Sequence, residues 1–254
     1  MTVASLPVAI LFGASGGIGA ACAHTFAAHG AIVCLSARRA EQLAAVGNSV
    51  RSAGGTVWTG AADVSQADQV QSVVNDVMAE YGRIDVVVDF AAVIGVLDRA
   101  TWQLDHADWT AALATNMTGP FNILRATLPV MVAQGRGTIL MASSPFGENV
   151  TPGMGAYAAS RAGSHALVRQ VAAELKNTGV GVCLVFPGMT DTAGLAAFRL
   201  ARGGAGFAAP VVSAEVMAKL FVWAAMQEAW RINGAVLSWA DPQVRNAALA
   251  LGPS

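Results

Sequence analysis

Short runs of β-branched residues alternate with longer segments of helical periodicity, and this alternation restricts the fold more than any other feature. It is typical of strand–helix–strand units, which build a parallel sheet covered by helices on both faces. The strands of such a sheet are buried on both faces and are therefore apolar throughout, and the three consecutive valines at 86–88 fit this pattern. Strands are predicted at 8–12, 31–36, 56–61, 84–91, 137–143, 181–186 and 235–239, and helices at 17–29, 39–53, 66–81, 108–133, 154–177 and 213–228. We therefore expect one doubly wound α/β domain over residues 1–254, with about seven parallel strands.

Composition excludes several classes of protein. Fifteen Lys and Arg against sixteen Asp and Glu give a net charge of -1, so we expect no binding to nucleic acid or to an anionic membrane. No apolar run reaches the roughly 20 residues of a spanning helix. The three cysteines form no paired motif, and the four histidines, His165 included, show no metal-ligand pattern and are expected as helix or surface residues. We expect a cytoplasmic protein without a bound metal, and the 54% hydrophobic content favours a homo-oligomer.

A glycine-rich loop follows the first predicted strand and leads directly into the first predicted helix. Glycines there allow a tight turn and close approach of backbone N–H groups to a pyrophosphate, and the helix N-terminus attracts the anion. The loop predicts a Rossmann-like dinucleotide site. Its residues are Gly13, Ala14, Ser15, Gly16, Gly17, Ile18 and Gly19.

The end of the second predicted strand bears on the choice of nucleotide. About 20 residues beyond such a loop an acid binds the ribose 2′-hydroxyl of NAD, but here no acid precedes Glu41. Arg38 offers a planar cation suited to a 2′-phosphate, with Arg39 as a weaker candidate. We therefore expect NADP(H) rather than NAD(H), while a plain solvated role stays open for both arginines.

Tyr157 and Arg161 share one face of a long predicted helix because they are four residues apart. A tyrosine ordinarily titrates near pH 10, so it needs a neighbouring cation to exchange protons at neutral pH, and Arg161 can supply that charge. Ser144 falls at the carboxyl end of the fifth predicted strand, the edge where open α/β sheets bind ligands. Its hydroxyl is expected to hold a substrate oxygen beside Tyr157.

Taken in order, these motifs resemble the short-chain dehydrogenase/reductase family over nearly the whole chain. The resemblance implies catalytic roles for Ser144 and Tyr157 and a proton-relay role for Asn116. It also implies tetrameric or dimeric assembly. Further cofactor contacts follow from the same resemblance: Asp63, Val64, Ala91, Pro187, Gly188 and Thr192.

Two departures from the family pattern affect the expected chemistry. The family's YxxxK is Tyr157-x3-Arg161 here, and its Asn-Asn-Ala-Gly segment is Asp89-Phe90-Ala91-Ala92. Arginine preserves the charge of the lysine, but its bulkier fork is not interchangeable with an ammonium. The Ser-Tyr-Arg triad is also similar to that of halohydrin dehalogenases, which bind no nucleotide.

Three functions therefore stay open. The leading hypothesis is an NADP(H)-dependent oxidoreductase that interconverts a carbonyl and a secondary alcohol, with Arg161 also touching the ribose. The alternatives are a cofactor-independent lyase of dehalogenase type and a catalytically impaired member that binds NADP(H). We expect a small apolar substrate and a mobile substrate lid at 191–210. The family resemblance implies that four apolar residues lie near the substrate pocket, although plain packing stays the simpler role for any one of them: Phe146, Met154, Phe198 and Phe207.

Overall fold

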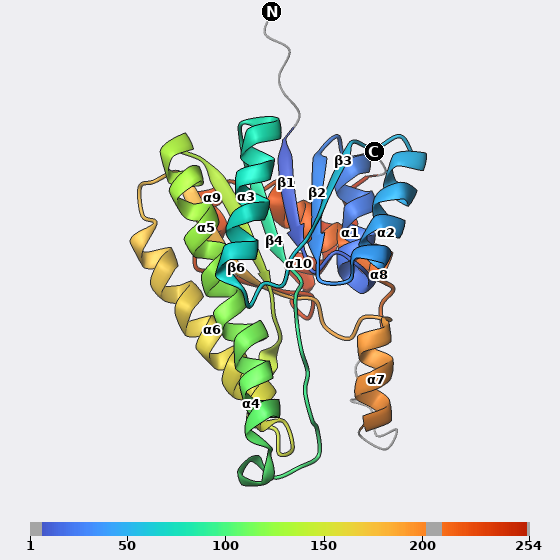
Figure 1. Ribbon diagram of the computed structural model, residues 1–254, viewed down its shortest axis with the longest axis vertical. Coiled ribbons are helices and arrows are strands. Elements are labelled where there is room, and N and C mark those ends of the chain that lie inside the picture. The colour runs from blue at the N-terminus through green and yellow to red at the C-terminus, as the bar shows by residue number, and fades with distance from the viewer. Residues whose placement is uncertain (1–6, 202–209, 253–254) are drawn as a thin grey trace, which may run out of the picture.

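The computed structural model describes residues 7–201 and 210–252, and its centre is a seven-stranded sheet (Figure 1). All neighbouring strands run parallel, in the order β3-β2-β1-β4-β5-β6-β7. The strands are β1 (Val8–Phe12), β2 (Ile32–Ala37), β3 (Val57–Ala61), β4 (Val86–Asp89), β5 (Gly137–Ala142), β6 (Val180–Phe186) and β7 (Val236–Ser238). The predicted doubly wound sheet is confirmed.

Helices cover both faces of this sheet (Figure 1). Along β1, Ala9 and Leu11 pack in the cluster that holds Phe26 and Phe221, whereas Ile10 and Phe12 pack in the opposite cluster. This is why the strands lack the polar alternation of a one-sided sheet. The helices are α1 (Gly17–Ala28), α2 (Ala40–Ser52), α3 (Ala67–Tyr81), α4 (His106–Leu113), α5 (Gly119–Gln134), α6 (Gly155–Glu174), α7 (Ala193–Ala201), α8 (Ala214–Ala225), α9 (Ala229–Ile232) and α10 (Pro242–Leu249).

The helix predicted at 108–133 is confirmed in extent, because the chain is helical without a break from 106 to 134, but it is not α-helical throughout. The chain forms α4, then a π-helical turn at Ala114–Thr118, then α5, which has a proline in its first turn. A π turn inserts one extra residue and rotates the side chains that follow it. This turn therefore brings Thr115 to a cavity at the carboxyl ends of the strands, which is described below, and it brings Asn116 to the loop after β4.

The segment expected as a mobile lid, 191–210, contains α7, which the sequence prediction missed. In Figure 1 this orange helix projects away from the body of the domain. Its Leu195 and Phe198 line the cavity. Residues 202–209, with the predicted pocket residue Phe207, lie outside the described part of the chain.

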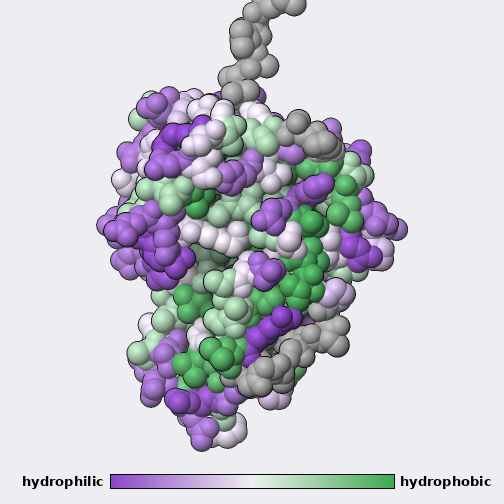
Figure 2. Space-filling model, turned by 90° about the vertical axis from the view of Figure 1, so that its right-hand side faces the viewer, coloured by the Kyte–Doolittle hydropathy of each residue, from purple (hydrophilic) through white to green (hydrophobic). Residues whose placement is uncertain are grey.

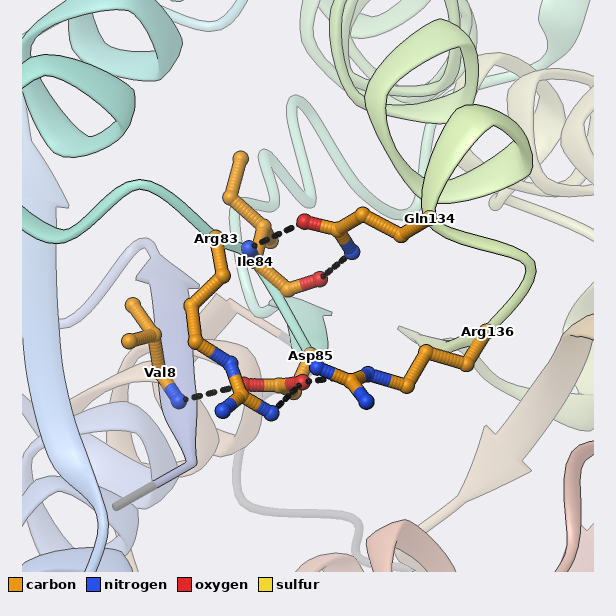
Figure 3. A network of polar contacts seen from close by, with 6 residues as sticks. All are labelled: Val8, Arg83, Ile84, Asp85, Gln134 and Arg136. Atoms are coloured by element: carbon orange, nitrogen blue, oxygen red, sulfur yellow. Dashed lines mark hydrogen bonds and ion pairs between the residues drawn. The ribbon is translucent and has the colours of Figure 1, made fainter. Parts of the chain in front are cut away.

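Asp85, just before β4, joins three parts of the chain at the amino ends of the strands (Figure 3). Its Oδ2 accepts a hydrogen bond of 2.9 Å from the backbone N–H of Val8, and its Oδ1 lies 2.5 Å from Arg83 and 3.4 Å from Arg136. Beside it, the side-chain amide of Gln134 bonds both backbone groups of Ile84. These contacts fix β1, β4 and the start of β5 relative to one another.

Asp85→Ala is expected to lower the free energy of unfolding by about 2 kcal/mol, because it removes the acceptor of the Val8 N–H and the carboxylate that lies beside Arg83 and Arg136. Urea unfolding measures this loss. Asp76→Ala, an exposed change on α3, is the control and should stay within about 0.5 kcal/mol of the parent protein. Equal stability of the two variants would contradict a structural role for the Asp85 contacts.

Candidate active site

A cavity of about 970 Å³ lies at the carboxyl ends of the strands. It runs from the glycine loop, past the start of α6, to α7. Three of the residues predicted from the sequence do not line this cavity, namely Ala14, Asp63 and Asn116, and Phe207 lies outside the described residues; the other predicted site residues line it. Its volume is at the upper end of the range for ligand pockets, about 300–1,000 Å³, so it has room for a large ligand.

The glycine end is built from the loop between β1 and α1. A Cβ on Gly13 would lie 2.6 Å from the backbone nitrogen of Ala91, so only glycine permits this approach to the loop after β4. The N-cap residue Gly16 has no side-chain capping bond, and the first turn of α1 contains no acid. The N–H groups and positive dipole end of α1 are therefore left for an anionic ligand.

Two arginines form the rim beside this loop. Arg39 donates a hydrogen bond of 3.3 Å to Ser15 Oγ in the glycine loop, and Arg38 lies 3.7 Å from the Asp63 carboxylate. The Arg38 side chain is 60% exposed, and β2 ends at Ala37 without an acidic side chain. Asp63 lies outside the cavity and acts here as the partner of Arg38, whereas Val64 lines the cavity.

The catalytic end is built from β5 and α6. Ser144 caps the short 3-10 turn Pro145–Gly147, and its Oγ accepts a hydrogen bond of 3.3 Å from Phe146 N. Tyr157 lies in the first turn of α6, and the Arg161 guanidinium carbon is 5.2 Å from the centroid of the tyrosine ring. The predicted neighbours Tyr157 and Arg161 thus stand together at the cavity.

Arg161 is a buried cation, with 4% of its surface exposed. One terminal nitrogen donates a hydrogen bond of 3.2 Å to the carbonyl of Ala142, at the end of β5, and its Nε has no protein partner. Thr190 Oγ1 is likewise buried, unpartnered and part of a residue that lines the cavity. Two buried polar atoms without partners in one cavity favour a polar ligand there.

Asn116 faces away from this cavity, toward the loop after β4. Its side chain accepts a hydrogen bond of 2.8 Å from Val93 N, and donates to Val93 O at 2.7 Å and to Ser160 Oγ at 3.0 Å. These bonds use both of its N–H groups. The side chain of Asn116 therefore fixes the cavity wall, and a role in proton relay stays a prediction.

Asp89, at the family's first asparagine position, ends β4 as a buried carboxyl. Its Oδ1 accepts a hydrogen bond of 2.9 Å from Ala91 N, which holds the turn that meets Gly13. Burial raises the pKa of Asp89 to about 7, against the opposing effects of that bond and of the Arg161 charge. The adjacent Phe90 contacts Phe221 edge to face, at 4.7 Å between ring centroids.

Apolar side chains line the cavity between Tyr157 and α7. Phe146 lies 6.3 Å from Tyr157 and 6.3 Å from Phe198, measured between ring centroids. Ile94, Met154 and Leu195 complete this part of the wall. Figure 2 shows the side of the molecule that carries α7, where apolar residues gather in a hollow between hydrophilic rims.

Sequence reasoning missed two polar residues at the catalytic end. His165, expected as an ordinary helix or surface residue, is 1% exposed, and its Nε2 lies 2.7 Å from the Oγ of Ser143. Ser143 lines the cavity beside Ser144. The signal was available, because His165 lies four residues beyond Arg161 and therefore on the same helix face.

Within residues 7–201 and 210–252, no group of three His, Cys, Asp or Glu side chains is placed to hold a metal ion. Within the same ranges, no helix combines the length and the apolar character needed to cross a membrane.

The sequence is similar to those of known proteins. Residues 7–202 match the family model described as short chain dehydrogenase. The 3-oxoacyl-acyl-carrier-protein reductase of Thermotoga maritima is 34% identical over 185 residues, which cover 73% of this chain and 74% of that protein. Glycine betaine reductase of Emericella nidulans is 36% identical over 185 residues, which are 73% of this chain but only 14% of that longer protein.

Solved structures agree with the sequence comparisons. A metagenomic short-chain oxidoreductase in complex with NADP superposes with a TM-score of 0.74 at 34% identity, covering 87% of this chain and 91% of the other. The fold, the glycine loop and the Ser-Tyr pair are those of an oxidoreductase that uses a nicotinamide cofactor. The chain belongs to the short-chain dehydrogenase/reductase family.

Asp89→Asn is expected to stabilise the protein increasingly as the pH rises from 4 to 7. The raised pKa means that the folded state keeps a proton the unfolded state releases, so wild-type stability falls over this window. Asparagine keeps the acceptor for Ala91 N without a charge. At pH 8 the gain should be on the order of 2–4 kcal/mol, measured by urea unfolding at several pH values. A gain that does not change with pH would contradict a buried, proton-binding Asp89.

Proposed function

We propose that this short-chain dehydrogenase/reductase interconverts a carbonyl and a secondary alcohol with NADP(H). The observation that carries the proposal is the continuity of one cavity from the uncapped N-terminus of α1 to Ser144, Tyr157 and Arg161. A nucleotide on the glycine loop and a substrate at Tyr157 would therefore share one space. The metagenomic relative in complex with NADP supports the same cofactor class.

The residues present fit such a cofactor. The glycine loop and the free N–H groups of α1 would receive the pyrophosphate. Arg38 and Arg39 would hold the 2′-phosphate, and the Arg39 bond to Ser15 places that cation over the loop. The unpartnered Nε of Arg161 and Oγ1 of Thr190 would meet polar groups of the nicotinamide nucleoside.

The protein's own groups would handle the proton and the orientation of the substrate. When bound, the reduced cofactor supplies a hydride to the carbonyl carbon. Ser144 and Tyr157 hold the carbonyl oxygen through their hydroxyls, and Tyr157 gives its proton to that oxygen as the alcohol forms. Arg161, held by Ala142 O, provides a fixed positive charge that stabilises the resulting phenolate. In the reverse direction Tyr157 takes the proton back.

The substrate is proposed to be small and largely apolar. Phe146, Phe198 and Leu195 form the wall next to Tyr157, and burial of apolar substrate surface against them would favour binding. The carbonyl oxygen would be the polar group that fixes the orientation, since Ser144 and Tyr157 offer two hydroxyls at that end of the cavity.

Tyr157→Phe should lower carbonyl reduction by NADPH by at least about a hundredfold, because it removes the proton donor and leaves the cavity shape intact. Absorbance at 340 nm over a panel of apolar ketones and aldehydes measures turnover. NADPH binding, followed by fluorescence, should be unchanged. A parent protein that neither binds NADPH nor reduces any member of the panel would overturn the proposed function. Halide release from haloalcohols without cofactor would support the lyase instead.

Replacing Arg38 and Arg39 together by alanine tests the cofactor preference. The Kd for NADPH should rise at least about tenfold, because charge-assisted hydrogen bonds contribute about 1.5–3 kcal/mol each and these side chains are partly solvated. The Kd for NADH should change little. Arg51→Ala, an exposed arginine on α2, is the matched control. Equal weakening of both nucleotides would contradict recognition of the 2′-phosphate by this pair.

A further inference from the structure

His165 contacts the chain on both sides of the catalytic serine. Before Ser144, the Oγ of Ser143 lies 2.7 Å from His165 Nε2. After it, the 3-10 turn packs on the ring, since a Cβ on Gly147 would lie 2.7 Å from His165 Cε1. Glu148 follows, with its Oε1 3.7 Å from His165 Nδ1. Ser144 thus sits in a short segment whose two ends both rest on one imidazole.

The ring itself is fixed from several directions. It is 1% exposed and stacks on Phe186 of β6, with 5.4 Å between ring centroids. Glu148 is held in turn by an ion pair with Arg169, one turn further along α6. Because the imidazole is buried among these groups, it has little freedom to rotate, and it can serve as a rigid support for the segment.

Tyr157, Arg161 and His165 are spaced four residues apart on α6, so they lie along one face of that helix. The first two face the cavity directly. The third holds the β5 end that carries Ser144. A single helix therefore presents the proton donor and also positions the serine that shares the substrate oxygen with it.

We propose that His165 is a positioning residue: through its hydrogen bond to Ser143 and its packing on the Gly147 turn, it sets the place of Ser144 relative to Tyr157. This inference rests on the proposed function for its effect on turnover. The contact itself can be measured without turnover.

The protonation of His165 suits this role. Burial lowers the pKa of His165 to about 4; the Glu148 carboxylate opposes that shift, and the charges of Arg161 and Arg169 add to it. The imidazole is therefore neutral at neutral pH. Nδ1 has no hydrogen-bond partner among the described residues, but the Glu148 carboxylate 3.7 Å away favours the tautomer with the proton on Nδ1, in which Nε2 accepts a hydrogen bond from the Ser143 hydroxyl. Ser143 then has one fixed hydroxyl direction.

Three variants test the hydrogen bond. His165→Phe keeps a ring against Phe186 but cannot accept from Ser143, Ser143→Ala removes the same bond from the other side, and His165→Gln offers a side-chain amide in its place. His165→Phe and Ser143→Ala should each lower kcat about tenfold to a hundredfold, since small misplacements of catalytic groups cost this much. The double variant should lose no more than either single one, and His165→Gln should recover part of kcat.

The Kd for NADPH should stay at the parent value in all three variants, which shows that each is folded. His29→Phe is the control, because that ring bonds only the carbonyl of Thr25 in its own helix. Losses that multiply in the double variant, or a His165→Phe protein with the kcat of the parent, would overturn the proposal.

Nuclear magnetic resonance of ring-labelled histidine tests the contact independently of any reaction. The His165 signals, assigned by their absence in His165→Gln, should show one neutral tautomer, protonated at Nδ1, from pH 8 to pH 5. A ring that titrates near its ordinary pKa would overturn the proposal even if the enzyme is active. The predicted tautomer in a protein that reduces no carbonyl would instead count against the proposed function alone.

Discussion

The reversal of strand order between β1 and β4 is the constraint on which the rest of the structure depends. Connections leave β1 toward β2 on one side and β4 toward β5 on the other, so the loops at the carboxyl ends of β1 and β4 separate and open a crevice. Gly13 and Ala91 meet at the floor of that crevice, with no room for a Cβ. The nucleotide loop, the Asp89 turn and the catalytic strand β5 are thereby brought to one edge.

Placing a cation at this edge has an energetic cost that the surrounding residues offset. Arg161 is buried, and its charge is compensated only in part by the Asp89 carboxyl, because burial raises the pKa of that carboxyl. The Ala142 carbonyl and the Tyr157 ring hold the guanidinium in place. A polar ligand in the cavity would complete the set of partners for its Nε.

Much of this could be predicted from the sequence, because periodicity and glycine spacing are local signals. The parallel sheet covered by helices followed from the alternation of elements, and the glycine loop and the Tyr157–Arg161 spacing located the cavity. The π turn before α5 and the helix α7 were missed, since both depend on tertiary packing. The π turn continues the helical pattern around it, and α7 lies in a segment rich in Gly and Ala that was expected as a lid. Asn116 and His165 show the same limit: their direction is set by partners far along the chain, Val93 and Ser143. The four-residue spacing places His165 on the same helix face as Arg161, but it does not report that Ser143 is the partner of the ring.

The proposed function requires hydride transfer within one continuous cavity, and isotope transfer measures that event directly. The protein would be incubated with an apolar ketone and NADPH that carries deuterium at the transferable ring position, in both stereochemical forms. One of the two forms should give an alcohol with one deuterium on its carbinol carbon, and the Tyr157→Phe protein should form that alcohol at least about a hundredfold more slowly. Alcohol formed without deuterium from either form, or no alcohol from a protein that binds NADPH, would contradict the proposed function.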